Sequence, residues 1–256
     1  MSTNKPYTQL PAVWDQMGQD RHSIKMVSYT LEIMKRHKIR ATTGLDLCCG
    51  TGTAINLFLD HGFIMAGLDG SPEMIAFAAK KLRGRGVRLY QKMLPKFRLI
   101  PDDNSRGTVR FDFVTSFYDS LNYMLTPEDL GQTFKSVANH LNDGGWFIFD
   151  MNTKEALTNI WGGHVYADSR DDLAWIWKND FDPRTARATC LTTTFVREGS
   201  SWRRFDENHT EAAYSNTRIK HLLKEAGFRV KEFYECYRFT RPNRDTLRIC
   251  AVAQRK

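Results

Sequence analysis

The sequence has 256 residues and a formal net charge of +8, from 37 Lys+Arg against 29 Asp+Glu. A hydrophobic content of 41% is enough to bury a full core, and a charged fraction of 26% excludes wholesale disorder. No stretch has the length and apolarity of a membrane span, and residues 1–6 lack a signal-peptide core, so we expect a cytoplasmic protein without a membrane partner. The five cysteines include no C-x2-C pair, which predicts reduced thiols and no zinc knuckle.

In chain order, the first 160 residues alternate between helical and extended patterns. Apolar residues at helical spacing in 13–38 predict one or two leading helices. Short buried strands are predicted at 43–49, 63–68, 87–90, 111–116 and 146–151, with helices at 53–61, 72–82 and 130–141. Strands and helices that alternate at this spacing indicate parallel β-α-β units in a doubly wound α/β fold.

The pattern changes after residue 160. Three extended segments are predicted at 172–180, 187–197 and 202–214, followed by a helix at 216–226 and two strands near 229–239 and 246–253 that form a hairpin. We therefore predict a mostly parallel, seven-stranded Rossmann-like sheet. Residues 1–160 and 215–256 build this main domain, and residues 161–214 build an antiparallel β insert, or lid, between the fifth strand and the last helix.

A glycine turn closes the first strand and opens a helix, in the string Leu45-Asp46-Leu47-Cys48-Cys49-Gly50-Thr51-Gly52-Thr53. Glycines at this place let a ligand approach the backbone at the carboxyl end of the strands. The dinucleotide fingerprint needs a small residue where Ile55 stands, and no Lys-Ser or Lys-Thr pair follows for a P-loop. The ligand is therefore expected to lack a pyrophosphate.

Two acids accompany this turn. Asp69 ends the second strand, where a carboxylate accepts both hydroxyls of a ribose; the alternative is that it caps the helix that begins after Ser71-Pro72. For Asp46 we expect hydrogen bonds that stabilise the glycine turn.

This order of strand, glycine turn, helix, strand and acid resembles class I S-adenosylmethionine-dependent methyltransferases, across nearly the whole chain outside the insert. The resemblance implies the seven-stranded sheet with an antiparallel last strand, S-adenosylmethionine as cofactor, and methyl transfer as the activity. The residues that it implies for cofactor binding are Asp46, Cys48, Gly50, Gly52, Asp69, Gly70, Met74, Lys92, Met93, Ser116, Phe117 and Trp14.

The chain departs from the family pattern at two of these positions. Cys48 stands where the family has its first glycine, and Lys92 where it has an acid that accepts the adenine amino group. Because a lysine cannot accept a hydrogen bond, we expect backbone groups near Lys92 and Met93 to hold the adenine. For Trp14, a role as a core anchor of the leading helix is as well supported as contact with the cofactor.

A narrower resemblance is carried by the string Asp119-Ser120-Leu121-Asn122-Tyr123 after the fourth strand. It is similar to a subgroup of small bacterial and archaeal methyltransferases, which also carry the pattern of Phe149-Asp150-x-Asn152 and of Arg204-Phe205-Asp206-Glu207-x-His209. If a proton must be removed from the acceptor, the side chains to test are His209, Tyr118, Asp119, Asn122 and Tyr123. The alternative for Asn122 and Tyr123 is that they cap and pack the following helix.

The insert is where we expect the substrate to bind. Residues 161–214 hold nine aromatic side chains and a net charge of −2, which suits a small-molecule amine better than a polyphosphate. On a strand, Glu207, His209 and Glu211 share one face, and we assign Glu207, Glu211, Tyr214 and Trp177 to the substrate. The alternatives are an exposed polar face and core packing of the aromatic rings. The acids and the histidine could also bind a metal, but nothing else in the sequence supports a metal site.

Three functions remain open from the sequence. The first is methyl transfer to nitrogen or oxygen of a small molecule, by a monomer or homodimer. The second is RNA methylation, and the third is cofactor binding without catalysis. Residues 215–256 carry eleven Lys+Arg and four Asp+Glu, so the basic excess lies on the last helix and hairpin and makes nucleic acid an unlikely partner for the predicted pocket.

Overall fold

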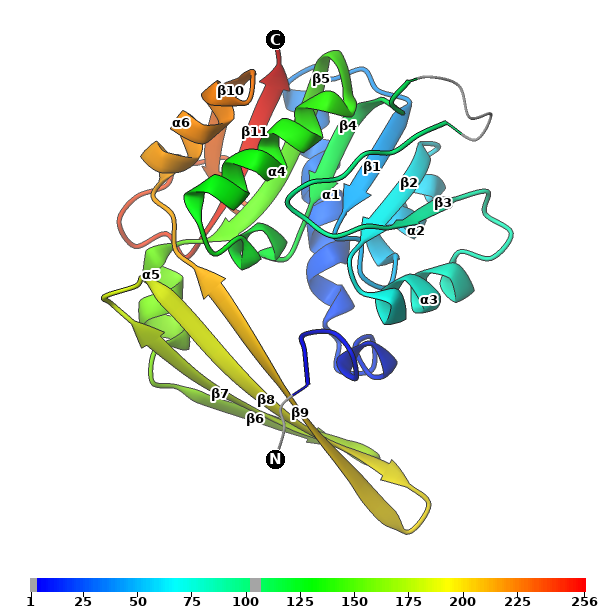
Figure 1. The fold of residues 1–256 in the computed structure, drawn as a ribbon, viewed down its shortest axis with the longest axis vertical. Coiled ribbons are helices and arrows are strands. Elements are labelled where there is room, and N and C mark those ends of the chain that lie inside the picture. The colour runs from blue at the N-terminus through cyan, green and yellow to red at the C-terminus, as the bar shows by residue number, and fades with distance from the viewer. Residues whose placement is uncertain (1–3, 102–106) are drawn as a thin grey trace.

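The protein is described from a computed structural model, which covers residues 4–101 and 107–256. Its larger sheet contains β1 (Thr43–Leu47), β2 (Ile64–Asp69), β3 (Arg88–Gln91), β4 (Phe111–Ser116), β5 (Leu141–Asn152), β10 (Phe228–Glu235) and β11 (Arg248–Arg255). The strand order is β10-β11-β5-β4-β1-β2-β3, and the five strands from β5 to β3 are parallel (Figure 1). The predicted doubly wound, seven-stranded sheet is confirmed.

The last strand runs against its neighbours. β11 lies between β5 and β10 and is antiparallel to both, with Ile249 opposite Met151 and Cys250 opposite Tyr234. The predicted hairpin of the two final strands is therefore present. β5 begins five residues earlier than predicted, because Leu141 already pairs with Phe111 before a register shift around Gly144, whose φ is 74°.

The second sheet is the insert. It has four antiparallel strands in the order β6-β7-β8-β9, namely β6 (Val165–Arg170), β7 (Leu173–Asp182), β8 (Arg187–Glu198) and β9 (Ser201–Ala212). Three strands were predicted, and the prediction is corrected to four. β6 escaped detection because all six of its residues are exposed, so its sequence shows no alternation between buried and solvated positions. Figure 1 shows the insert as a long twisted ribbon beside the main sheet.

Helices cover both faces of the main sheet. They are α1 (Asp20–Arg36), α2 (Thr53–Asp60), α3 (Pro72–Lys81), α4 (Pro127–Asn139) and α6 (Asn216–Glu225), with short helical turns at η1 (Leu10–Ala12), η2 (Ser120–Tyr123), α5 (Lys154–Ala156) and η3 (Leu157–Trp161). Alternate residues of β5 enter different cores: Phe147 and Phe149 pack toward α4 and α6, whereas Ile148 packs toward α1 and α2. Within the described residues, no helix is both long and apolar enough to cross a membrane.

Residues 4–19 form a segment that we call the N-terminal strap. It lies between the main sheet and the insert, where Figure 1 shows it in dark blue. Leu10, Val13 and Met17 of the strap are buried in a small apolar cluster with the insert residues Trp175 and Phe205. The strap thus joins the two sheets near the carboxyl ends of the parallel strands.

Candidate active site

A cavity of about 750 Å³ opens at the carboxyl ends of β1, β2 and β4. Its walls come from the glycine turn after β1, the start of α3, the turn after β4, and the strap. This is the place at which open α/β sheets bind their ligands. The charged residues that line it are Lys5, Asp20, Asp46, Asp69 and Glu73. Four acids against one base favour a cationic ligand.

The glycine turn has an unusual backbone. Cys48, Gly50 and Gly52 have φ angles of 59°, 53° and 81°, in the left-handed region. Cys48 adopts this conformation without being a glycine, which costs free energy that the surrounding contacts must offset. A Cβ atom on Gly52 would lie 2.8 Å from the Leu82 side chain, so this glycine allows α2 and α3 to approach each other.

Asp69 connects the two loops that border the cavity. Its carboxylate accepts hydrogen bonds from Gly50 N at 2.8 Å and from Ser71 N at 2.9 Å. Burial raises its pKa, although these N–H bonds oppose the rise. The cap of α3 is made by Ser71, whose Oγ accepts a hydrogen bond from Met74 N at 3.0 Å. Asp69 is therefore not the helix cap, and it remains at the cavity wall.

Asp46 lies beneath the glycine turn. It is 3% exposed and accepts a hydrogen bond of 2.7 Å from the Thr115 hydroxyl. Burial raises its pKa to about 7, against the lowering effect of that hydrogen bond. Asp46 is therefore a buried carboxyl group in the cavity wall whose pKa lies near neutral pH.

The predicted cofactor residues are largely gathered around this cavity. Those in its wall are Trp14, Asp46, Cys48, Gly50, Asp69, Gly70, Met74, Met93 and Phe117. Three others lie outside the wall: Gly52 contacts α3, Ser116 is buried in β4, and the Lys92 side chain is exposed. We expected backbone groups near Lys92 and Met93 to hold the adenine, and Met93 and Leu94 line the cavity.

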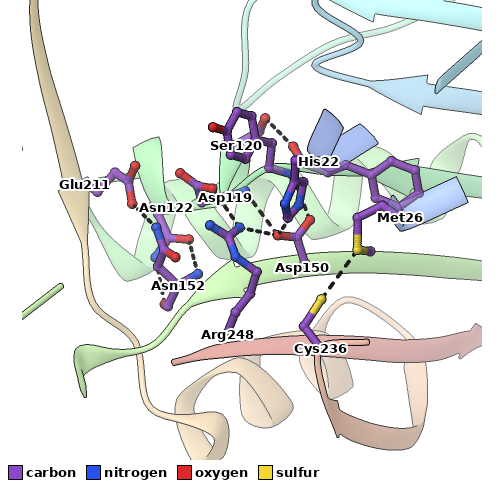
Figure 2. A network of polar contacts seen from close by, with 12 residues as sticks. His22, Met26, Asp119, Ser120, Asn122, Asp150, Asn152, Glu211, Cys236 and Arg248 are labelled. Atoms are coloured by element: carbon purple, nitrogen blue, oxygen red, sulfur yellow. Dashed lines mark hydrogen bonds and ion pairs between the residues drawn. The ribbon is translucent and has the colours of Figure 1, made fainter. Parts of the chain in front are cut away.

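The turn after β4 is held by a buried ionic network (Figure 2). Tyr118 and Asp119 have φ angles of 60° and 51°. Asp150, at the end of β5, accepts a hydrogen bond from Tyr118 N at 2.8 Å. Arg248 of β11 binds both Asp150 and Asp119, the latter at 2.7 Å, and His22 Nε2 lies 3.3 Å from Asp150. These contacts fix a turn whose backbone is strained.

A second part of the network ties the insert to this turn. The Asn122 side chain donates to the carbonyl oxygens of Asn152 and Ala212, at 3.1 and 3.0 Å, and accepts from Asn152 N at 3.0 Å. Asn152 in turn donates to Glu211 Oε2 at 3.0 Å. Burial and the nearby carboxylate of Asp119 raise the pKa of Glu211 well above its usual range. Glu211 thus joins β9 to the turn through Asn152.

The predicted catalytic and substrate residues divide into three groups. Tyr118 and Tyr123 line the cavity, and His209 lies directly behind Tyr123. Asp119, Asn122 and Glu211 belong to the buried network. Tyr214 is buried with its hydroxyl on the Met124 carbonyl oxygen, and Trp177 is half-buried on the insert, so neither meets the cavity.

Glu207 anchors the strap. Its carboxylate is fully buried and accepts hydrogen bonds from the backbone N–H groups of four consecutive residues, Tyr7, Thr8, Gln9 and Leu10, at 2.5–3.0 Å. Burial alone would raise the pKa of Glu207, but the His209 ring and these N–H groups bring it below its usual range. Glu207 is therefore covered by the strap and does not lie on an exposed polar face of β9.

The other end of the strap is fixed to the main domain. Asp15 accepts a hydrogen bond from the Thr51 hydroxyl at 2.8 Å and pairs with Lys81 at 2.7 Å, and Ser71 donates to the Tyr7 carbonyl oxygen at 2.8 Å. The strap brings Tyr7 into the cavity wall, which the sequence did not indicate. Among the residues that the structure covers, no group of three or more His, Cys, Asp or Glu could hold a metal ion.

Comparison with known proteins gives a consistent result. Residues 45–145 match the methyltransferase domain family. The putative methyltransferase YqeM of Bacillus subtilis (strain 168) is 29% identical over 82% of this chain and 83% of its own length. A dTDP-3-amino-3,4,6-trideoxy-alpha-D-glucopyranose N,N-dimethyltransferase of Streptomyces venezuelae is 27% identical over 80% of this chain and 76% of its own. The crystal structure of an S-adenosylmethionine-dependent methyltransferase of Clostridium acetobutylicum ATCC 824 has a TM-score of 0.84 at 28% identity, over 97% of this chain and 98% of that one.

Proposed function

Because this chain is an S-adenosylmethionine-dependent methyltransferase, we propose that it methylates the nitrogen of a small-molecule amine. The observation that carries the proposal is a set of four aromatic rings, from Tyr7, Trp14, Tyr118 and Tyr123, in the wall of the acidic cavity. We further propose that the chain is part of the subgroup defined by the Asp119–Tyr123 string, and that residues 161–214 act as its substrate lid.

The cavity suits the cofactor. This proposal is supported by Asp69, which lies at the end of β2 where a carboxylate can accept ribose hydroxyls, and by Gly50, which has no side chain to block the approach of a ligand. Met93 and Leu94 offer an apolar surface for adenine. When bound, the cofactor supplies a methyl group activated by a sulfonium. The protein then has to place the acceptor in line with that methyl group and keep water away.

The aromatic rings suit a cationic acceptor. The Tyr7 ring lies 5.5 Å from Trp14 and 5.8 Å from Tyr123, and the Trp14 ring lies 5.8 Å from Tyr118, measured between centroids. An ammonium among such rings gains cation–π attraction, most strongly where it is desolvated. The acidic lining at Asp20 and Glu73 adds to this attraction. An uncharged alcohol would gain neither.

The relative from Streptomyces venezuelae supports the same choice, since its name gives an amino sugar as the methyl acceptor.

RNA methylation is less well supported, because the basic residues of 215–256 lie on α6 and the final hairpin, away from the acidic cavity. Phosphate binding would require the opposite charge in that wall.

The proposal is tested by measuring S-adenosylhomocysteine formation with a panel of primary amines and their matched alcohols, including a dTDP-amino sugar and its hydroxy analogue. We expect turnover with an amine and none with the matched alcohol. Trp14→Leu should lower kcat/KM for the amine, whereas Trp146→Leu, at a half-buried tryptophan of β5 outside the cavity wall, should leave it unchanged. Methylation of the alcohol in preference to the amine would contradict the proposal.

A further inference from the structure

A continuous chain of polar side chains runs from the cavity wall into the buried interface between strap and insert. The hydroxyls of Tyr7 and Tyr123 are 2.9 Å apart, and Tyr123 Oη lies 2.7 Å from His209 Nδ1. On the far side of the ring, His209 Nε2 lies 3.4 Å from Glu207 Oε2. Tyr7 and Tyr123 line the cavity, whereas His209 and Glu207 are buried. The chain thus connects the site of methyl transfer to a buried carboxylate.

The Glu207 carboxylate favours one direction for the hydrogen bonds that connect Tyr7, Tyr123 and His209. This carboxylate already receives the backbone N–H groups of residues 7–10, so it stays ionised and can only accept. We assign the proton of a neutral His209 ring to Nε2, which lies 3.4 Å from Glu207 Oε2, so that Nδ1 can accept a hydrogen bond from the Tyr123 hydroxyl. Tyr123 oxygen then accepts from the hydroxyl of Tyr7.

This order leaves the oxygen of Tyr7 as an acceptor toward the cavity. Burial raises the pKa of Tyr7 and of Tyr123, so both hydroxyls keep a proton at neutral pH. Each hydroxyl can therefore accept one proton and pass on another, and the group that finally takes up the proton is His209. The groups that face His209 are Tyr7 from the strap, Tyr123 from η2, Cys190 from the adjacent strand β8, and Glu207 and Glu211 from its own strand. The Glu207 carboxylate faces the His209 ring on the side away from Tyr123.

We propose that Tyr7, Tyr123 and His209 form a proton relay that deprotonates the acceptor ammonium, with Glu207 as the residue that positions the His209 ring. The inference rests on the proposed amine acceptor. The acceptor N–H bond breaks and its proton passes to Tyr7 oxygen, the Tyr7 proton passes to Tyr123, and the Tyr123 proton passes to His209 Nδ1. The electron pair left on nitrogen then forms the N–C bond as the C–S bond breaks, which leaves a neutral thioether and an imidazolium beside Glu207.

The first experiment is a pH profile of single-turnover methyl transfer with an amine identified in the panel. Tyr123→Phe keeps the ring and removes the relay hydroxyl, and we expect it to lower the rate about 100-fold at pH 7, as loss of general base catalysis does. The deficit should shrink above the pKa of the free amine, where the acceptor arrives deprotonated. Tyr234→Phe removes a hydroxyl that lies 3.0 Å from the His37 ring and outside the cavity wall, so it is the matched control and should not change the rate. A deficit of the same size at every pH would mean a structural role and overturn the relay.

The second experiment needs no acceptor. Sinefungin carries an amino group where the transferred methyl group stands, so it places a nitrogen at the reaction centre. Tyr7→Phe should weaken sinefungin binding about tenfold by calorimetry and change S-adenosylhomocysteine binding less than twofold. Equal changes for the two ligands, or no change for either, would overturn the assignment of Tyr7 to the reaction centre. If no amine in the panel is methylated, the proposed function fails, and this second measurement still decides on the relay's position.

Discussion

The ion network behind the Tyr118–Asp119 turn makes a strong prediction about stability. Arg248→Met keeps most of the volume of the side chain but removes the cation that binds Asp119 and Asp150. The two carboxylates are 11% and 0% exposed, so the variant leaves buried charges whose arginine partner is gone. Removing one partner of a buried ion pair costs roughly 3–5 kcal/mol.

We expect the lower end of that range, about 3 kcal/mol, because Arg248 itself keeps 20% of its side chain exposed and His22 remains beside Asp150. The melting temperature should fall by roughly 6–12 °C, at 2–4 °C for each kcal/mol in a chain of this size. The loss should also depend on pH. Burial alone would raise the pKa of Asp150, but Arg248 and His22 bring it down to about 2.

In the native protein the Asp150 carboxylate therefore stabilises the fold at every pH above about 4, and this stabilisation is lost only as the pH falls toward 2. Without Arg248 the pKa of the buried Asp150 rises. The folded variant then binds protons that the unfolded chain does not, and its stability falls as the pH increases. The deficit should be largest at pH 7–8 and smaller at pH 5.

Urea unfolding at pH 5 and pH 8 measures this difference directly. Arg244→Met is the matched control, since that side chain is 93% exposed and pairs only with its neighbour Asp245 in the described structure. The control should lose less than about 0.5 kcal/mol. A loss below 1 kcal/mol for Arg248→Met, or a deficit that grows toward pH 5, would refute the reasoning.

Three further predictions concern the cavity and the strap. Asp69→Asn should raise the Kd for S-adenosylhomocysteine by roughly 10–100-fold in calorimetry, as expected for a lost charged acceptor; unchanged binding would remove the ribose assignment. Asp46→Asn should stabilise the free protein at pH 8, by at most about 4 kcal/mol. The reason is that a carboxyl group whose pKa is raised to about 7 in the folded protein destabilises the fold as the pH rises from 4 to 7. Equal melting curves of the variant and the native protein at pH 8 would contradict this. Glu207→Gln should speed proteolytic cleavage within residues 4–19 at pH 7, with little change elsewhere. Because the pKa of Glu207 is lowered in the folded protein, the difference in cleavage rate from the native protein should diminish as the pH falls below about 4.5. Identical mass-spectrometric digests of the two proteins at pH 7 would argue against Glu207 as the anchor of the strap.

The main sheet could be predicted because its signals are local. The glycine turn and Asp69 each follow a short apolar run, and apolar residues at helical spacing resume after the glycine turn and after Pro72. The alternation along residues 203–211 also placed Glu207, His209 and Glu211 on one face, which is how β9 presents them. Among the strands of the described residues, β6 alone was missed, since a fully exposed strand has no hydrophobic pattern.

The contacts that complete the candidate site could not be predicted in this way. Glu207 binds backbone N–H groups of residues 7–10, and a backbone donor leaves no mark on the sequence. Arg248 meets Asp150 and Asp119 from a strand distant in the chain, so no spacing rule connects them. The signal in the sequence was the polar pair Asp150 and Asn152 directly after the apolar run of residues 146–149.

The position of β11 also has a consequence for the order of assembly. The four strands of the insert follow one another through short turns, so their pairing closes only small loops. β11 instead enters between β5 and β10, and its pairing with β5 closes a loop that spans the whole insert and α6. Because large loops close slowly, we expect the insert to acquire its structure before the middle of the main sheet does. The cavity and its ionic support would then appear together, in the final step of folding, when Arg248 reaches Asp119 and Asp150.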